Sequence, residues 1–202
     1  MKTNEERLNE MLRRLEYLDR IRVDEIPKID LYMDQVTTFM ESRLADMKRY
    51  PEDKVLTKTM INNYAKNNLL PAPVRKKYTR DHVLLLVLIY YFKNVLNFTD
   101  IETVFSYITE RHFGGQNPSL AEVYEEVFAM EHGQMESLKQ DVRKKYETAK
   151  GTFSQVEEDE DREALQLFSL ICELAFDVYL KKQMIERLCD DLRAEAPPKK
   201  KK

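Results

Sequence analysis

The segment from residue 57 to residue 92 constrains the fold more than any other part of the chain. It joins, in order, a short polar stretch without Asp or Glu, a proline-bounded basic loop and a fully apolar stretch. Thr57 can cap the first stretch as a helix, and Asn68 can end it in the left-handed conformation that Asn tolerates better than most residues. Pro71 and Pro73 then forbid continuation of the helix. This order suits a small winged helix-turn-helix that contacts DNA.

Composition favours helix over strand along the whole chain. Of the 202 residues, 43% are hydrophobic, which is enough to bury a core, and only 4 are glycines. Leu, Glu, Lys and Arg, which form helices readily, are abundant. We therefore expect an all-α globular protein.

Capping residues, prolines and glycines place the helix boundaries. We expect helices over about 4–20, 31–49, 58–68, 80–96, 100–111, 118–150 and 161–193, with caps at Thr3, Asp30, Thr57, Thr79, Thr99 and Asn117. The expected domains are an N-terminal amphipathic helix (1–26), a winged helix-turn-helix region (27–96), a C-terminal helical region for dimerisation or sensing (97–193) and a disordered basic tail (194–202).

Charge is distributed unevenly, although the formal net charge is only −3. From Lys54 to Lys93, 8 basic residues stand against the single acid Asp81. From Gly151 to Leu165, 6 acids stand against one arginine. The nearly neutral total is therefore a local compensation between a basic and an acidic stretch.

The cysteines and the longest apolar run favour a cytoplasmic protein. Cys172 and Cys189 lie 17 positions apart in one helical pattern, too far to bridge each other, and nothing resembling a signal peptide starts the chain. The run from Val83 to Phe92 has 10 residues, about half of the roughly 20 that a membrane-spanning helix needs. We expect a core helix there and no membrane partner.

One face of the helix after Thr57 has the residue types that contact DNA. Met60, Ile61, Tyr64 and Ala65 form the apolar face, which leaves Lys58, Thr59, Asn62, Asn63 and Lys66 on the other. Asn can pair with the adenine edge, and Thr and Lys reach bases or phosphates. The loop that follows adds Arg75, Lys76 and Lys77, and Arg80 opens the next helix, so these cations are candidates for phosphate contacts. The alternative is that both features are only a solvated polar surface.

These residues resemble the DNA-binding half of MerR-type regulators. That resemblance rests on Thr57, Ile61, Tyr64, Leu69, Leu70, Pro71, Tyr78, Thr79, Val83 and Leu86. The chain departs from that pattern at Asn62, Asn63, Ala65, Asn68 and His82, lacks the Gly-Tyr-Arg of the wing, and has a longer loop before the recognition helix. A wider stretch is similar to the bacterial family called domain of unknown function 1836. Together the resemblances imply a MerR-like winged helix-turn-helix embedded in a multi-helix bundle, without implying an activity.

Catalytic chemistry is not indicated. His82, His112 and His132 fall on three different expected helices, the cysteines lack metal-pair spacing, and Gly114-Gly115 reads as a turn. We expect no enzyme activity, no cofactor and no metal site. Tyr90, Tyr91, Phe92, Phe105 and Tyr107 could line an aromatic effector pocket, although no effector can be named.

Two functions remain open. The first is a DNA-binding transcriptional regulator whose partner is double-stranded DNA. The second is a helical protein–protein interaction module that retains the fold without binding DNA. In the last helix, Ala164, Phe168, Ile171, Ala175, Val178, Lys182, Ile185, Cys189 and Leu192 follow steps of three and four residues. This seam suits a homodimer through the C-terminal helix, or equally an intramolecular bundle.

Overall fold

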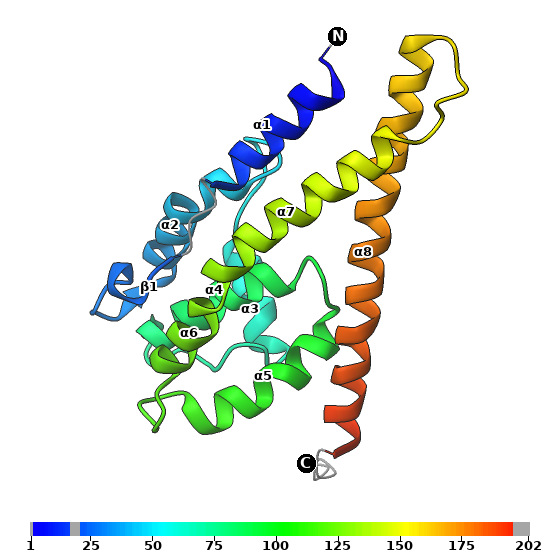
Figure 1. Cartoon of the computed structure of the whole chain (residues 1–202). Coiled ribbons are helices and arrows are strands. Elements are labelled where there is room, and N and C mark those ends of the chain that lie inside the picture. Colours follow the sequence, from blue (N-terminus) through cyan, green and yellow to red (C-terminus); the bar gives the residue numbers. More distant parts are fainter. Residues whose placement is uncertain (1, 17–20, 196–202) are drawn as a thin grey trace. The chain divides into compact units, whose positions relative to one another are not determined.

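The computed structural model describes residues 2–16 and 21–195, which form helices joined by loops and one two-stranded sheet (Figure 1). The expected all-α class is therefore confirmed. By its contacts the chain divides into unit 1, residues 1–19 and 129–183, and unit 2, residues 20–128 and 184–202. Residues 97–128 thus belong to the same unit as residues 27–96. The expected basic tail lies, from residue 196 on, outside the described residues.

In unit 2 the two strands of the small sheet are separated in sequence by helices. Its elements are η1 (Val23–Glu25), β1 (Leu31–Tyr32), α2 (Met33–Leu44), η2 (Ala45–Met47), α3 (Lys58–Lys66), β2 (Lys77–Tyr78), α4 (Arg80–Phe92), α5 (Phe98–His112), α6 (Leu120–Ala129) and the end of α8 (Asp159–Glu195). The strands are antiparallel, with Leu31 opposite Tyr78 and Tyr32 opposite Lys77. The sheet therefore ties the start of α2 to the start of α4.

Helix α4 is the centre of unit 2, as its apolar sequence predicts. Residues 82–87 and Ile89 are all buried. They share one core cluster with Met40 of α2, Ile61 of α3, Ile101 of α5 and Leu120 of α6. Because each buried aliphatic side chain contributes about 1.5–3 kcal/mol, this cluster fixes the helices that surround α4.

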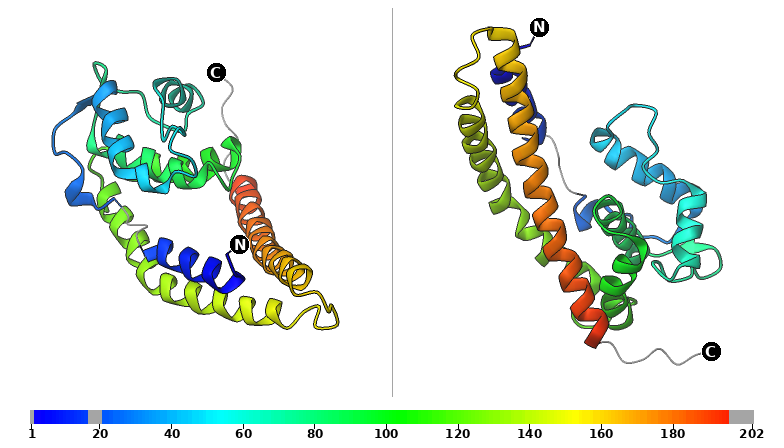
Figure 2. Two further views of the ribbon diagram at one scale, coloured as in Figure 1. Left: turned by 90° about the horizontal axis from the view of Figure 1, so that it is seen from above. Right: turned by 90° about the vertical axis from the view of Figure 1, so that its right-hand side faces the viewer.

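Unit 1 is a small helical bundle of α1 (Asn4–Glu16), α7 (Glu131–Lys150) and the first part of α8. Helix α1 lies along α7, and α7 and α8 run antiparallel (Figure 2). The predicted capping box of α1 is present, since Thr3 N–H donates to Glu6 Oε2 over 2.9 Å and Glu6 N–H to Thr3 Oγ1 over 3.2 Å. The core holds Leu8, Leu12, Val142, Tyr146, Ala149 and Leu170. That is a small core for a unit of this length.

Two expected helix starts are wrong. Asp30 does not cap the second helix, because Leu31 and Tyr32 form β1 and Tyr32 occupies the N-cap position, where its N–H donates to Gln35 Oε1 over 2.8 Å. Pairing with β2 buries Leu31, and such tertiary contacts override local propensity. The box at Thr99 is shifted to Asn97, whose Oδ1 accepts from Asp100 N–H over 2.9 Å.

The long helix expected from residue 118 to residue 150 is also wrong. It is divided into α6 and α7, with the break at Met130 beside the boundary between the units. The cap is Ser119 rather than Asn117: Ser119 N–H donates to Glu122 Oε2 over 2.8 Å, and Glu122 N–H returns to Ser119 Oγ over 3.3 Å. A Ser followed three residues later by Glu is itself a capping box.

Candidate nucleic-acid interface

Helix α3 is held by one face and presents the other to solvent. Thr57 caps it, its Oγ1 accepting from Met60 N–H over 3.1 Å, and Asn68 follows it with φ of 58°, as predicted. Ile61 and Tyr64 are buried in the core of unit 2. The opposite face, comprising Lys58, Thr59, Asn62, Asn63 and Lys66, is exposed throughout. The predicted division of the two faces is therefore present.

A long segment, rather than a tight turn, joins α2 to α3. Val55 in this segment is buried, and Glu41 Oε2 of α2 accepts from its N–H over 3.2 Å. On the other side Lys93 Nζ donates to the carbonyl of Val55 over 3.0 Å, and burial lowers the pKa of Lys93. Lys48 also pairs with Glu41. The segment is therefore fixed to both α2 and α4, which positions α3 without a short turn.

The basic loop ends in a tight hairpin turn. Lys77 N–H donates to the carbonyl of Val74 over 3.0 Å, and the two residues form a bridge. Between them Arg75 and Lys76 have φ of 52° and 64°. Positive φ at both central positions defines a type I′ turn, for which Asn-Gly is the preferred sequence. Side-chain-bearing residues other than Asn and Asp are strained there, yet the chain holds two exposed cations in this position.

Three of the other predicted cations have protein partners. Lys77 is half-buried, and its Nζ lies 5.6 Å from the centre of the Tyr32 ring. Arg80 is half-buried, and its Nη2 donates to the carbonyl of Val23. Lys58 stays exposed but pairs with the exposed Asp34 at the start of α2. Among the predicted cations, Lys66, Arg75 and Lys76 therefore remain exposed without such a partner in the part of the chain that the structure describes.

His82 stands at the N3 position of the α4 capping box, where an acid is usual. Its Nδ1 accepts from Thr79 N–H over 3.0 Å, which requires the tautomer protonated at Nε2. Its ring lies between Tyr78 and Phe113, at 5.5 Å and 4.8 Å between ring centres. Burial lowers the pKa of His82, against an opposing effect of the nearby Pro71 and Ala72 carbonyls, and Nε2 is buried without a hydrogen bond. His82 thus joins the loop to α4 as a neutral side chain.

Other kinds of site have little support in the structure. Among the described residues, no group of His, Cys, Asp and Glu side chains has the arrangement of a metal site. Of the aromatic side chains considered for an effector pocket, Phe92 and Phe105 pack on each other at 5.5 Å between ring centres, and Tyr107 is exposed. None of the helices described has both the length and the apolar character needed to cross a membrane.

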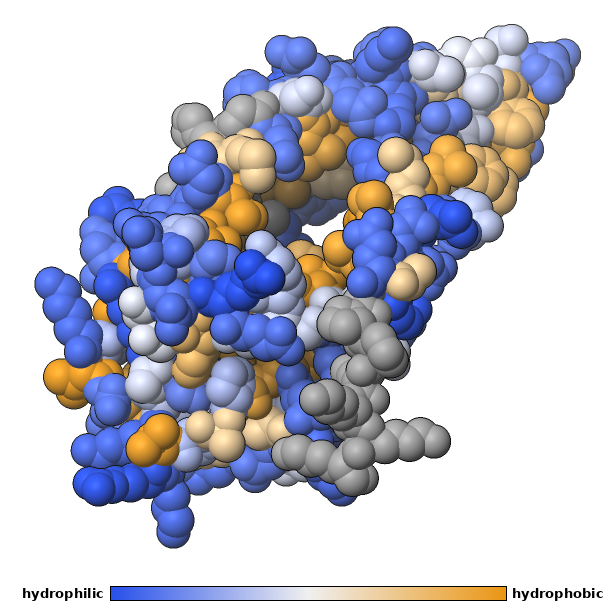
Figure 3. All heavy atoms as spheres, turned by 90° about the horizontal axis from the view of Figure 1, so that it is seen from below, coloured by the Kyte–Doolittle hydropathy of each residue, from blue (hydrophilic) through white to orange (hydrophobic). Residues whose placement is uncertain are grey.

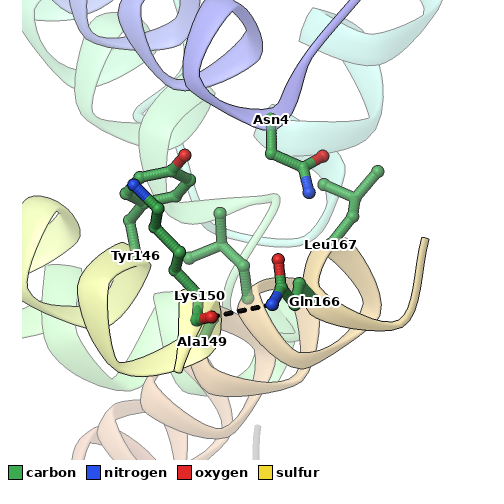
Figure 4. A pocket seen from close by; sticks show the side chains of 7 residues that line it. Asn4, Tyr146, Ala149, Lys150, Gln166 and Leu167 are labelled. Atoms are coloured by element: carbon green, nitrogen blue, oxygen red, sulfur yellow. Dashed lines mark hydrogen bonds between the residues drawn. The ribbon is translucent and has the colours of Figure 1, made fainter. Parts of the chain in front are cut away.

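A shallow pocket lies in unit 1, away from the predicted site residues. It is lined by Asn4, Tyr146, Ala149, Lys150, Gln166, Leu167 and Leu170 (Figure 4). Gln166 donates to the carbonyl of Lys150 across it, over 2.7 Å. The pocket has room for about one water molecule, so it does not form a ligand site.

The structure therefore describes a helical protein in which an acid-free helix face and a cationic hairpin turn belong to the same unit. The chain belongs to the family described as Domain of unknown function (DUF1836), whose model matches residues 21–127. This range nearly coincides with the first segment of unit 2, so it contains both α3 and the hairpin, whereas α1, α7 and α8 lie outside it. Comparison with curated proteins gives no match, and comparison with solved structures gives none either.

Proposed function

We propose that unit 2 is a MerR-like winged helix-turn-helix that binds double-stranded DNA and that the protein is a transcriptional regulator without catalytic activity. The observation that carries the proposal is the exposed face of α3, which has Lys, Thr and Asn and no carboxylate of its own. The order strand, helix, helix, hairpin and helix supports it, because β1 pairs with the strand that leads into α4. The tight turn that precedes α4 is then the wing.

Within this proposal the residues have separate roles. Asn62 and Asn63, with Thr59, face base edges, since Asn matches the donor and acceptor pattern of adenine in the major groove. Lys66, Arg75 and Lys76 hold phosphates, which supplies affinity for any sequence. Lys58 reaches DNA after leaving Asp34, an exchange between exposed partners that costs little. Lys77 and Arg80 act mainly by holding the wing and α4 in place.

The competing function is a helical interaction module that keeps this fold and binds a protein instead. The features that favour it are the carboxylate of Asp34 beside Lys58 and the engagement of Arg80 with the backbone of Val23. The Asp34 carboxylate offsets the charge of Lys58, and the hydrogen bond to Val23 holds the half-buried Arg80 side chain against the protein instead of a DNA phosphate. The two functions differ in their salt dependence, because only DNA binding releases condensed counterions.

The test is binding of a random duplex by fluorescence anisotropy at two salt concentrations. We expect micromolar affinity that falls steeply with salt, and a log-log slope that loses about two units when Arg75 and Lys76 are both replaced by Ala. Arg143→Ala with Lys144→Ala is a matched control, because it removes an adjacent, exposed Arg-Lys pair from unit 1. An absence of binding at low salt, or an equal effect of the two double variants, would overturn the proposal.

A further inference from the structure

Four consecutive lysines follow the last described helix. Helix α8 ends at Glu195, and residues 196–202 are one alanine, two prolines and Lys199 to Lys202. No other stretch of the sequence has four basic residues in a row. The four lysines lie outside the described residues, so the helix that carries them is what indicates where they can act.

The end of α8 is fixed to unit 2. Ile185 packs against the core of that unit, and Cys189 is only 1% exposed. One helical turn further on, Arg193 donates from Nη2 to Oδ1 of Asp100 over 2.6 Å. The last turns of α8 therefore belong to the unit that contains α3, and the chain that carries the lysines leaves from a fixed point on this unit.

Helix α3 and the end of α8 contact the same turn of α5. The Phe98 ring meets the Tyr64 ring of α3 edge to face, at 5.9 Å between ring centres. Asp100, the partner of Arg193, comes two residues after Phe98, so both belong to the first turn of α5. Figure 3 shows the face of the molecule on which α5 and the end of α8 lie, and the side chains there are mainly hydrophilic. The lysines thus follow a point close to α3 on a polar surface.

The chain after Glu195 is long enough to reach the exposed face of α3. Tyr64 lies on the buried face of α3, and a helix with its side chains is about 10–12 Å across. The 7 residues after Glu195 span at most roughly 25 Å when extended. The lysines can therefore stand beside a duplex that lies against the exposed face of α3.

The positive charge at this end of unit 2 comes from the four lysines alone. From residue 184 to residue 195, 4 acids stand against 2 arginines. Both arginines are paired, Arg187 with Asp191 and Arg193 with Asp100. The described end of α8 would therefore repel a polyanion, and four additional positive charges reverse that sign.

We propose that Lys199 to Lys202 bind phosphates of the duplex that α3 and the turn at Arg75 and Lys76 hold. This inference rests on the proposed function and extends it, because the contact is independent of sequence and lies outside the residues that the family model matches. Since the lysines are attached to the same unit as α3, they meet the bound duplex at a high effective concentration. Each lysine that neutralises a phosphate adds about 0.9 to the slope of log affinity against log salt concentration.

The test compares two quadruple variants of the full chain in anisotropy titrations of a random duplex. Replacing the four lysines by Ala should weaken binding and lower the log-log slope by about 2–4 units. The control places Ala at four exposed basic positions of unit 1, namely Arg7, Arg143, Lys144 and Lys150. Net charge changes equally in both variants, so only the first should lose slope. An equal loss in the two variants would overturn the proposal.

A photocross-linker tests whether the lysines act in the same complex as α3. Cys189 is buried, so Lys200→Cys in a Cys172→Ser background gives one reactive thiol. A benzophenone maleimide on that thiol should label the duplex. The labelling should fall in parallel with binding when Arg75→Ala and Lys76→Ala are added. Labelling that persists would mean that the lysines bind DNA on their own, which contradicts the proposal.

The outcomes separate this inference from DNA binding itself. If the wild type binds the duplex and loss of the lysines leaves the slope unchanged, only the further inference is wrong. If loss of the lysines instead abolishes binding to vesicles that contain phosphatidylserine, the lysines serve an acidic lipid surface and the inference is again overturned. An absence of duplex binding by the wild type at low salt would overturn both proposals.

Discussion

Arg193 Nη2 donates to Oδ1 of Asp100 over 2.6 Å, and the Asp100 side chain is only 8% exposed. The other carboxylate oxygen accepts from Asn97 Nδ2 over 2.7 Å, so the carboxylate is held from both sides. Arg193 lies outside the residues that the family model matches. The end of α8 therefore completes a polar contact at the start of α5 within unit 2.

Replacing Arg193 by Ala should release the end of α8 and leave the Asp100 carboxylate with less compensation. We expect a lower Tm and faster hydrogen exchange of the amides from residue 185 to residue 195, because a nearly buried charge that loses its partner is unfavourable. Arg187→Ala is the control, since its partner Asp191 is on the same helix and both are exposed. Equal exchange in the two variants would show that Asp100 does not hold the helix.

The strained turn at Arg75 and Lys76 predicts opposite effects on stability and on the proposed DNA binding. Replacing Arg75 by Asn and Lys76 by Gly supplies the preferred type I′ sequence, so the free energy of unfolding should rise by about 1–2 kcal/mol. The same change removes two exposed cations and should weaken binding to random duplex DNA. Urea unfolding and fluorescence anisotropy on one preparation measure both.

The Ala double variant at the same positions separates the two causes. It removes the charges while keeping side chains at positive φ, so DNA affinity should fall as far without the gain in stability. If the Asn-Gly variant is stabilised but binds DNA as the wild type does, the turn is only a structural hairpin.

The burial pattern around α3 and α4 was predictable because it follows from local chemistry. Met60, Ile61 and Tyr64 share one helical face, so the first of these helices buries that face. The run from Val83 is apolar on all sides, so the second helix is buried all round. The cap at Thr57 and the left-handed Asn68 are also intrinsic properties of those residue types.

The features that sequence did not reveal depend on distant partners. Leu31 becomes a strand residue because Tyr78 pairs with it, and a two-residue strand has no visible alternation. Arg75-Lys76 does not have the sequence of a type I′ turn, so the hairpin could not be predicted from those residues. Nor did the spacing of acids and bases indicate that Arg80 would bind the carbonyl of Val23.

His82 predicts how stability depends on pH. Because burial lowers its pKa in the folded state, the unfolded chain binds a proton more readily as the pH falls below about 6.5, the ordinary value for His. The contribution of His82 should therefore be fully present above that pH and should be lost progressively below it. His82→Gln keeps an acceptor for Thr79 N–H and should flatten this dependence in urea unfolding measured from pH 7.5 down to about 5. Background from the half-buried His112 is measured with His112→Gln.

Glu41 should hold in place the segment that precedes α3. Glu41→Ala removes the acceptor for Val55 N–H and the partner of Lys48, at a cost of about 1 kcal/mol because the carboxylate is partly exposed. Hydrogen exchange of the amides from residue 50 to residue 57 should become faster while exchange in α4 is unchanged. A uniform increase across unit 2 would mean that Glu41 acts on global stability.

Asn62 tests whether α3 reads bases. Once a preferred sequence has been selected from random duplexes, Asn62→Ala should cost about 1–3 kcal/mol on that sequence and much less on random DNA, because a bidentate base contact is lost. Asn67→Ala is the matched control, since Asn67 donates its side-chain amide to the carbonyl of Asn63 and lies at the end of the helix. Anisotropy titrations on both duplexes give the ratio of affinities. A loss from Asn62→Ala that is equal on the two duplexes would assign Asn62 to the phosphates and leave specificity to other residues of α3.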